Sequence, residues 1–277
     1  MKLGIRGHDI LEKPSWVGTL TVALKSAGLD TVQLVCYKSI DDVEYKANGI
    51  SRDMAAYLGQ ILEECEINVA LLGAYFNPVH PDAAKAELGV TVFKEYLSFA
   101  KELNAPLVAS ETGSYNGDKW MYHPRNRTPE ALAAVTRTFG DLCRYAGEYG
   151  VSVGIEGAAG HVCHSVKALK SVINDIGAQN LKVVFDYYNF MDNENKDYAA
   201  ILNEGLSTFD NIHCFHIKDC SLDSGAQVPV GQGDIDFPKI LGMIKSYDKN
   251  AALILEGTAA KDAKQAGEFI KRVWDGV

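Results

Sequence analysis

Several features that would narrow the function of a protein are missing from this sequence. No apolar run approaches the ~18 residues that a membrane-spanning helix needs, and no positively charged and then apolar leader precedes the first strand-like segment at residues 3–6. The six cysteines show no CxxC spacing, which is typical of unpaired thiols in a reducing compartment. We therefore expect a cytoplasmic protein with no membrane as a partner.

Basic residues are also fewer than acidic residues. The chain has 27 Lys and Arg against 36 Asp and Glu, and its formal net charge is -9. Because phosphate backbones are bound by clustered Lys and Arg, this balance argues against nucleic acid as a partner. A small phosphorylated metabolite needs only one local cationic spot, so the expected partner is a small molecule.

The chain contains neither a linker nor a low-complexity segment, so residues 1–277 are expected to form a single domain. Short apolar runs without polar alternation predict eight buried strands, at about 3–6, 30–36, 69–75, 107–111, 153–156, 182–186, 212–216 and 251–256. Helical spacing and capping residues predict helices at about 15–24, 51–64, 84–103, 128–149, 165–176, 198–209, from 236 onward, and 259–274. No glycine-rich phosphate turn follows the first strand, as an open doubly wound sheet would require. Eight strand–helix units favour an α/β fold, the closed (β/α)8 TIM barrel.

Charged side chains recur where the later strands end. The four residues are Glu156, Asp186, His216 and Glu256. Because the carboxyl ends of parallel strands meet at one mouth of a barrel, we expect these side chains to converge. Each of them alone has a structural explanation, such as a turn residue or a core histidine, but like charges packed together need a cation. Three carboxylates and one imidazole predict one divalent ion, with Mn²⁺ favoured and Mg²⁺, Co²⁺ or Zn²⁺ as alternatives.

Further polar residues at or just after the strand ends are candidates for substrate binding. They are Asn77, Glu111, His161, Asn189 and Lys218. Glu111 would either contact the substrate or anchor a loop, and His161 is open to a substrate contact or a supporting role. The loop at 112–127 contains Trp120 and Tyr122, which would either cover the mouth of the barrel or pack against another subunit.

Four short motifs carry a family resemblance: VGIEG around Glu156, FDYYN around Asp186, HCFHIKD around His216 and LILEG around Glu256. In this order, and over essentially the whole chain, the motifs resemble the xylose-isomerase-like sugar phosphate isomerase/epimerase superfamily. The resemblance implies a TIM barrel that holds one divalent metal ion through these four residues, and it favours a homo-oligomer. The chain departs from many sugar epimerases at two positions. Asn189 replaces a histidine three residues after the metal aspartate, and Leu222 replaces an arginine six residues after the metal histidine.

The resemblance and the paired glutamates predict a metal-dependent isomerase or epimerase of a sugar, keto-sugar or sugar phosphate. The ion would polarise a carbonyl and the neighbouring hydroxyl, while Glu156 and Glu256 move a proton from and to the adjacent carbon through an enediolate. A dehydratase of a keto-polyol, such as a keto-inositol, would use the same proton abstraction and then expel hydroxide. A non-catalytic sugar-binding barrel and cleavage of abasic DNA are two further readings, and the acidic charge argues against the second.

Overall fold

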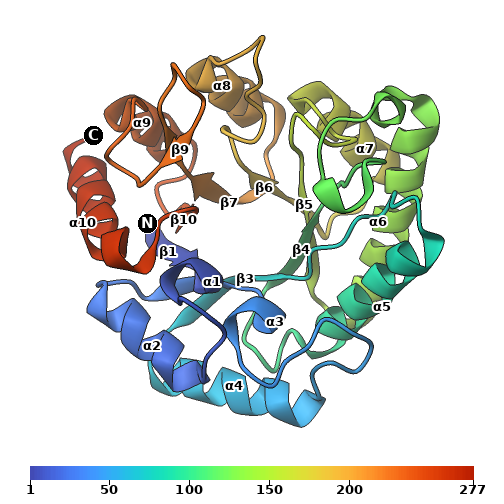
Figure 1. Ribbon diagram of the computed structural model, residues 1–277, viewed down its shortest axis with the longest axis horizontal. Coiled ribbons are helices and arrows are strands. Elements are labelled where there is room, and N and C mark those ends of the chain that lie inside the picture. Colours follow the sequence, from blue (N-terminus) through green and yellow to red (C-terminus); the bar gives the residue numbers. More distant parts are fainter.

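In the computed structural model, which describes all residues from 1 to 277, eight parallel strands close into one barrel with the larger helices ringed around it (Figure 1). The strand order is β1-β10-β7-β6-β5-β4-β3-β2, and β2 pairs with β1 to close the ring. The barrel strands are β1 (Lys2–Arg6), β2 (Thr31–Leu34), β3 (Asn68–Gly73), β4 (Leu107–Glu111), β5 (Ser152–Glu156), β6 (Leu181–Phe185), β7 (Ile212–Ile217) and β10 (Ala252–Leu255). The predicted TIM barrel is confirmed.

Long helices connect the strands and cover the outside of the barrel. They are α2 (Val17–Ser26), α4 (Arg52–Glu64), α5 (Ala83–Phe99), α6 (Pro129–Tyr149), α7 (Val166–Ile176), α8 (Tyr198–Thr208), α9 (Phe237–Tyr247) and α10 (Ala260–Gly276). At the start of α6 the Thr128 hydroxyl accepts a hydrogen bond from the Ala131 N–H while Pro129 occupies the first turn, as the sequence predicts. None of these helices is both long enough and apolar enough to span a membrane.

The sequence does not predict the short elements that follow the strands. They are α1 (Gly7–Ile10), α3 (Cys36–Ser39), the 3-10 helices η1 (Gly117–Lys119) and η2 (Pro124–Arg127), and the hairpin strands β8 (Asp219–Cys220) and β9 (Gln227–Val228). Such elements are too short for the hydrophobic pattern to repeat within them. Two predicted boundaries also shift. β2 ends at Leu34 because Cys36 begins α3, and α5 ends at Phe99, before a turn in which Asn104 has a φ of 53°.

The core has two parts because successive side chains of a strand point to opposite faces of the sheet. A cluster of 71 buried apolar residues packs the strands against the helices, and a separate cluster of 7 comes from the inward positions of the strands. The interior is tight at Gly154 on β5, where an added Cβ would lie 2.7 Å from the Ala109 Cβ. Toward the carboxyl ends of the strands, the inward positions change from apolar to charged residues.

Candidate active site

The alternation that builds the barrel interior also places the candidate site. On β6 the inward residue Val184 belongs to the inner apolar cluster, and Asp186 follows it by two positions. The same step of two leads from Cys214 to His216 on β7 and from Ile254 to Glu256 after β10. Because side chains two positions apart share a face of a strand, all three polar residues point into the same mouth of the barrel.

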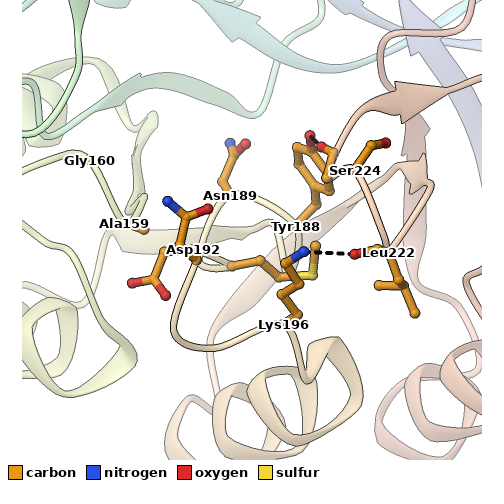
Figure 2. Close-up of a pocket in the computed structure, with 11 residues that line it drawn as sticks. Ala159, Gly160, Tyr188, Asn189, Asp192, Lys196, Leu222 and Ser224 are labelled. Carbon is orange, nitrogen blue, oxygen red and sulfur yellow. Dashed lines mark hydrogen bonds between the residues drawn. The ribbon is translucent and has the colours of Figure 1, made fainter.

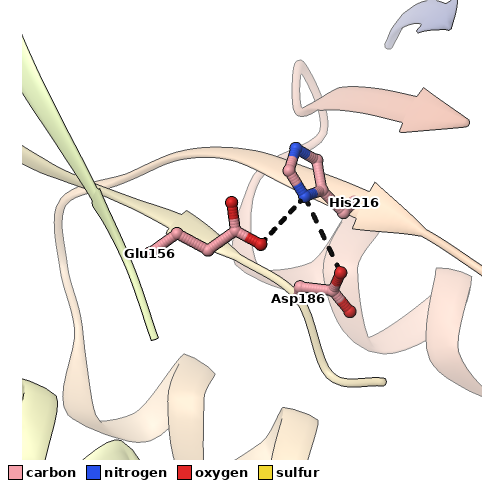
Figure 3. Close-up of side chains that lie close together, drawn as sticks. All are labelled: Glu156, Asp186 and His216. Carbon is pink, nitrogen blue, oxygen red and sulfur yellow. Dashed lines mark ion pairs between the residues drawn. The ribbon is translucent and has the colours of Figure 1, made fainter. Parts of the chain in front are cut away.

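Three of the predicted ligands form a compact buried group, the ligand cluster of Glu156, Asp186 and His216 (Figure 3). One ligand atom from each residue lies within 4.8 Å of the others. His216 Nδ1 is 3.3 Å from Glu156 Oε1 and 3.7 Å from Asp186 Oδ2. At most 1% of each residue is exposed. These three side chains could hold a metal ion.

Several polar atoms of the ligand cluster have no hydrogen-bond partner. Glu156 Oε2 has neither a hydrogen bond nor an ion pair, whereas Asp186 Oδ2 and His216 Nδ1 make no hydrogen bond but lie within ion-pair distance of Lys218 Nζ and Glu256 Oε2, respectively. Unpaired buried polar atoms are costly, and a set of carboxylate oxygens and one imidazole nitrogen is suited to a divalent cation. Burial lowers the pKa of His216, but the charges of Glu156 and Glu256 outweigh burial and hold this pKa well above its usual range. The residues present therefore fit a divalent ion.

Glu256, the fourth predicted ligand, has its two carboxylate oxygens in different surroundings. Its Oε2 lies 3.0 Å from His216 Nδ1 and so reaches the ligand cluster. Its Oε1 lies 2.7 Å from Lys218 Nζ and 2.8 Å from Arg6 Nη1. Burial raises the pKa of Glu256, but Lys218 and His216 have the stronger effect and bring it well below its usual range. Glu256 is therefore ionised and anchored at the edge of the cluster.

Lys218 and Asn189 form a polar bridge between the carboxylates. Lys218 Nζ lies 2.9 Å from Asp186 Oδ2 and donates a hydrogen bond to Asn189 Oδ1 at 2.8 Å. Asn189 Nδ2 in turn donates to Glu156 Oε1 at 2.8 Å. Burial lowers the pKa of Lys218, but Asp186 and Glu256 raise it by more, so the ammonium group stays charged. Both residues therefore contact the ligand cluster directly.

Gln33 touches the cluster as well, although sequence reasoning does not select it as a site residue. Gln33 Oε1 accepts a hydrogen bond from His216 Nε2 at 2.7 Å, and Gln33 Nε2 donates to the Tyr75 hydroxyl at 2.7 Å. Gln33 is fully buried on β2. One feature of the sequence could have identified Gln33: it is the single amide inside the apolar run at 32–35. A buried amide needs polar partners, so such a residue is expected to contact other buried polar groups.

Glu111 and His161 form a second pair beside the cluster. Glu111 is the register partner of Glu156 between β4 and β5, and burial together with the charges of Glu156 and Glu256 raises the pKa of Glu111 to about 8. Glu111 Oε2 is 3.7 Å from His161 Nδ1. The other ring nitrogen, His161 Nε2, hydrogen-bonds the carbonyl of Trp120 at 3.1 Å, and burial lowers the pKa of His161 to about 4. Without an ion, Glu111 is thus mostly protonated at neutral pH and His161 is uncharged.

A cavity of about 270 Å³ opens beside these residues. Its walls include three of the predicted site residues, Glu111, Glu156 and Glu256. Tyr75 and Trp120 supply aromatic walls, and Arg6 and Lys38 supply basic ones. The cavity therefore brings carboxylates, cations and aromatic rings together at the carboxyl ends of the strands, where the active sites of such barrels lie.

Asn77 lies behind the loop that follows β4. Asn77 Nδ2 donates to the carbonyls of Ser114 at 2.6 Å and Gly117 at 3.1 Å, and the Ser114 N–H donates back to Asn77 Oδ1 at 3.1 Å. Gly113 has a φ of 67°, and an added Cβ there would lie 2.1 Å from Asn77 Oδ1. Asn77 therefore supports the loop that carries Trp120, and its contact with a substrate stays a prediction.

A second cavity, of about 340 Å³, lies beside Asn189 (Figure 2). The segment after β6 and the β8–β9 hairpin form its walls, and Lys196 Nζ ties them together by donating to the carbonyl of Leu222 at 2.8 Å. Asn189 lines this cavity while it also binds Glu156. Both positions at which the chain departs from many sugar epimerases, Asn189 and Leu222, thus line one cavity next to the ligand cluster.

Two related proteins align with nearly the whole chain. An uncharacterised protein of Methanocaldococcus jannaschii is 22% identical over 280 residues, which cover 98% of this chain and 92% of the relative. A probable L-ribulose-5-phosphate 3-epimerase of Mycoplasma pneumoniae is 21% identical over 291 residues, which cover 99% of this chain and 90% of the relative.

Solved structures share the fold over the full length. A D-tagatose 3-epimerase-like protein superposes with a TM-score of 0.80 at 19% identity, covering 100% of this chain and 98% of that one. The IOLI protein with a binding zinc atom gives a TM-score of 0.76 at 18% identity, with 100% and 99% covered. The probable 3-DHS dehydratase AsbF of Bacillus anthracis gives 0.76 at 11% identity, with 98% and 99% covered.

The sequence pattern of one family extends over most of the barrel. The description of that family is xylose isomerase-like TIM barrel, and the match runs from residue 22 to residue 273. It includes β2 to β10 and every residue of the ligand cluster. The chain therefore belongs to the xylose isomerase-like TIM barrel family.

Proposed function

We propose that this chain is a divalent-metal-dependent isomerase or epimerase of a sugar, keto-sugar or sugar phosphate. The observation that carries the proposal is the buried ligand cluster, in which Glu156 Oε2, Asp186 Oδ2 and His216 Nδ1 make no hydrogen bond and lie beside an ionised Glu256 at the mouth of the barrel. A relative named as a probable L-ribulose-5-phosphate 3-epimerase and a structural neighbour named as a D-tagatose 3-epimerase-like protein support the substrate class.

Glu156, Asp186 and His216 would hold the ion, and Glu256 Oε2 would complete the ligand set. When bound, the ion acts as a Lewis acid that makes a C–H bond next to a sugar carbonyl easier to ionise. The oxygen-rich donor set favours Mn²⁺, and Mg²⁺, Co²⁺ and Zn²⁺ suit the same ligands. A structural neighbour that carries a zinc atom supports metal binding by this fold.

Glu156 and Glu256 are the proposed acid–base pair. Glu256 is ionised and accepts a proton from a substrate carbon, while the C–H electron pair moves toward the neighbouring carbonyl oxygen to give an enediolate. Glu156, oriented by Asn189, or Glu256 itself then returns a proton. The two glutamates come from β5 and β10, which are separated by β6 and β7, so they approach a bound sugar from different directions. Return to the opposite face of the same carbon is epimerisation, and return to the adjacent carbon is isomerisation.

The proposed substrate contacts fall into two groups. Glu111 lines the cavity and, when protonated, donates a hydrogen bond to a sugar oxygen, with His161 beside it. Lys218 and Asn189 already bind carboxylates of the ligand cluster, so their proposed contacts are the substrate oxygens nearest the ion. Asn77 would act through the loop that carries Trp120, which closes one side of the cavity.

A dehydratase of a keto-polyol, such as a keto-inositol, is a second candidate function. It uses the same proton abstraction but then breaks a C–O bond, and the leaving hydroxide departs as water when an acid donates a proton to it. Glu111 favours this candidate because it lines the cavity, and burial with the charges of Glu156 and Glu256 raises its pKa, which favours the protonated acid. A structural neighbour named as a probable dehydratase supports it. An enone absorption in the ultraviolet would identify this reaction.

The proposal takes a small carbohydrate as the partner. The net charge of -9 argues against nucleic acid. All six cysteines are free, which supports a reducing compartment such as the cytoplasm. The proposal includes a homo-oligomer, which would cover the adjacent exposed apolar side chains of Met121 and Tyr122 on the loop after β4.

Hydrogen exchange at carbon tests the proposed function. The Mn²⁺-loaded protein is incubated in D₂O with a panel of ketoses, keto-sugars and their phosphates, and deuterium at carbon is measured by mass spectrometry. We expect exchange with at least one sugar, loss of exchange in Glu156→Gln and Glu256→Gln, and wild-type exchange in Glu204→Gln, an exposed control on α8. Sugar binding without exchange in the wild-type protein would instead identify a non-catalytic sugar-binding barrel.

A further inference from the structure

A chain of hydrogen bonds runs from the ligand cluster to the cavity wall. It links His216 Nε2 to Gln33 Oε1 at 2.7 Å, and Gln33 Nε2 to the hydroxyl of Tyr75 at 2.7 Å. Gln33 lies on β2 and His216 on β7, with β1 and β10 between them, so the glutamine side chain reaches across the barrel interior. Gln33 and His216 are buried, and Tyr75 is the member that lines the 270 Å³ cavity.

The hydrogen positions in this chain are coupled. His216 Nδ1 faces the carboxylates, so it is the nitrogen that would hold a cation; the ring hydrogen would then sit on Nε2 and be donated to Gln33 Oε1. With its oxygen turned to His216, the Gln33 amide has only its NH₂ group to offer Tyr75, whose oxygen accepts. The hydrogen of the Tyr75 hydroxyl is then free, and the structure gives this hydroxyl no other hydrogen bond. Because Tyr75 lines the cavity, this hydrogen is available to a ligand there.

The reverse direction is not the one that the structure shows, and it would leave His216 Nδ1 unable to hold an ion. If the Gln33 amide is turned round, its NH₂ group donates to His216 Nε2, and the ring hydrogen moves to Nδ1, 3.0 Å from Glu256 Oε2. The Tyr75 hydroxyl then donates to Gln33 and has no hydrogen left for the cavity. The occupied ligand cluster therefore corresponds to the direction in which Tyr75 is a hydrogen-bond donor toward the cavity.

We propose that Gln33 is a positioning residue that holds His216 as its Nε2-protonated tautomer, and that Tyr75 donates its hydroxyl hydrogen to an oxygen of the substrate in the cavity. This inference rests on the proposed function, and it names the group that Tyr75 recognises: a carbonyl, hydroxyl or enediolate oxygen of the sugar. Burial and the nearby charges of Glu156, Glu111 and Glu256 raise the pKa of Tyr75 well above its usual range, so the phenol keeps its hydrogen at neutral pH.

Metal binding tests the role of Gln33 without any substrate. The dissociation constant of Mn²⁺ alone is measured by calorimetry for the wild type, Gln33→Leu, Gln33→Glu and Tyr75→Phe. Removing the acceptor in Gln33→Leu should weaken Mn²⁺ binding by about 10- to 100-fold. Gln33→Glu keeps an acceptor for His216 and should bind Mn²⁺ at least as tightly as the wild type. Tyr75→Phe leaves the His216–Gln33 bond in place and should stay close to the wild type.

Turnover separates the two roles. A glutamate at position 33 cannot donate to Tyr75 and accepts its hydrogen instead, so Gln33→Glu should lose the substrate contact while it keeps the metal. With Mn²⁺ saturating, Gln33→Glu and Tyr75→Phe should both lower kcat/KM for the exchanging sugar by about 100-fold, as loss of one well-placed donor does. A role in folding alone would not give tight metal binding together with poor turnover in the same variant.

Four results would each overturn a part of this inference. Wild-type Mn²⁺ affinity in Gln33→Leu, or a loss in Gln33→Glu as large as in Gln33→Leu, would remove the positioning role of Gln33. Wild-type kcat/KM in Tyr75→Phe would remove the role of Tyr75. Absence of exchange with every sugar would overturn the proposed function and the role of Tyr75 with it, while the metal titrations would still decide the role of Gln33.

Discussion

Lys218 Nζ lies 2.7 Å from Glu256 Oε1 and 2.9 Å from Asp186 Oδ2, so one buried ammonium group binds carboxylates that follow two different strands. Lys218 also donates to Asn189, which in turn binds Glu156. The carboxylates at the mouth of the barrel therefore share a built-in positive charge. This charge offsets part of their mutual repulsion whether or not an ion is bound.

Replacing this lysine should destabilise the ion-free protein. In Lys218→Met the buried carboxylates of Asp186 and Glu256 lose their partner, so the free energy of unfolding should fall by about 3–5 kcal/mol. Urea unfolding with a chelator present measures the change. Excess Mn²⁺ should recover part of the loss, because the ion supplies positive charge at the same carboxylates.

The exposed ion pair between Lys85 and Asp118 provides the matched control. Its nitrogen and oxygen atoms lie 2.7 Å apart, as close as the buried pair. Because water screens this pair, Lys85→Met should leave the unfolding midpoint unchanged. Equal effects of the two lysine substitutions would contradict the assigned role of Lys218.

The ligands should contribute unequally to metal affinity. Asp186→Asn removes a buried member of the ligand cluster and should weaken Mn²⁺ binding by more than ~100-fold. Glu256→Gln should weaken it by only ~10-fold, because one carboxylate oxygen of Glu256 is already held by Lys218 and Arg6. Titration calorimetry measures both, with Glu204→Gln as control. A loss in Glu256→Gln as large as in Asp186→Asn would show that Glu256 is a ligand of equal weight.

Metal affinity should rise with pH. In the ion-free protein, burial lowers the pKa of His216, but Glu156 and Glu256 raise it by more, so the ring is protonated at neutral pH. The ion needs the deprotonated Nδ1, so binding releases a proton and affinity increases about tenfold per pH unit below that pKa. Calorimetry in two buffers of different ionisation enthalpy counts the released protons. A count of zero at pH 7 would contradict the raised pKa.

His161 should make the fold sensitive to mild acid. Burial lowers its pKa from 6.5 to about 4, so between these values the unfolded chain binds a proton that the folded chain does not. Stability is therefore lost as pH falls from 6.5 toward 4, by up to about 3 kcal/mol. In His161→Asn the unfolding free energy, measured with a chelator present, should fall less steeply across this window. A slope identical to that of the wild type would rule out this contribution.

The ligand cluster was accessible from sequence because it depends on topology. Parallel strands end at one mouth and side chains alternate along each strand, so Glu156, Asp186 and His216 had to converge once the barrel was assigned. That these three residues bind one metal ion together does not follow from topology, and it stays a prediction. Glu256 also converges, but the strand pattern does not show that Arg6 and Lys218 hold one of its oxygens.

Contacts that depend on long side chains were beyond sequence reasoning. A substrate contact of Lys218 stays a prediction, but the sequence did not predict that its ammonium group lies among carboxylates, because rotamers rather than strand period set that position. The contact of Gln33 with His216 exists only because the sheet closes and brings β2 across from β7. Asn77 holds a loop through three hydrogen bonds, and no pattern in the sequence marks that loop conformation.

The origin of the four predicted metal ligands within the chain bears on how this barrel could be engineered. Glu156, Asp186, His216 and Glu256 all come from the second half of the sequence, on or just after four consecutive strands. Much of the facing wall, including Lys38, Tyr75 and Trp120, comes from the first half. A mutant library aimed at accepting new sugars can therefore be confined to the loops after β1 to β4, with Gln33 kept, and should leave metal loading intact.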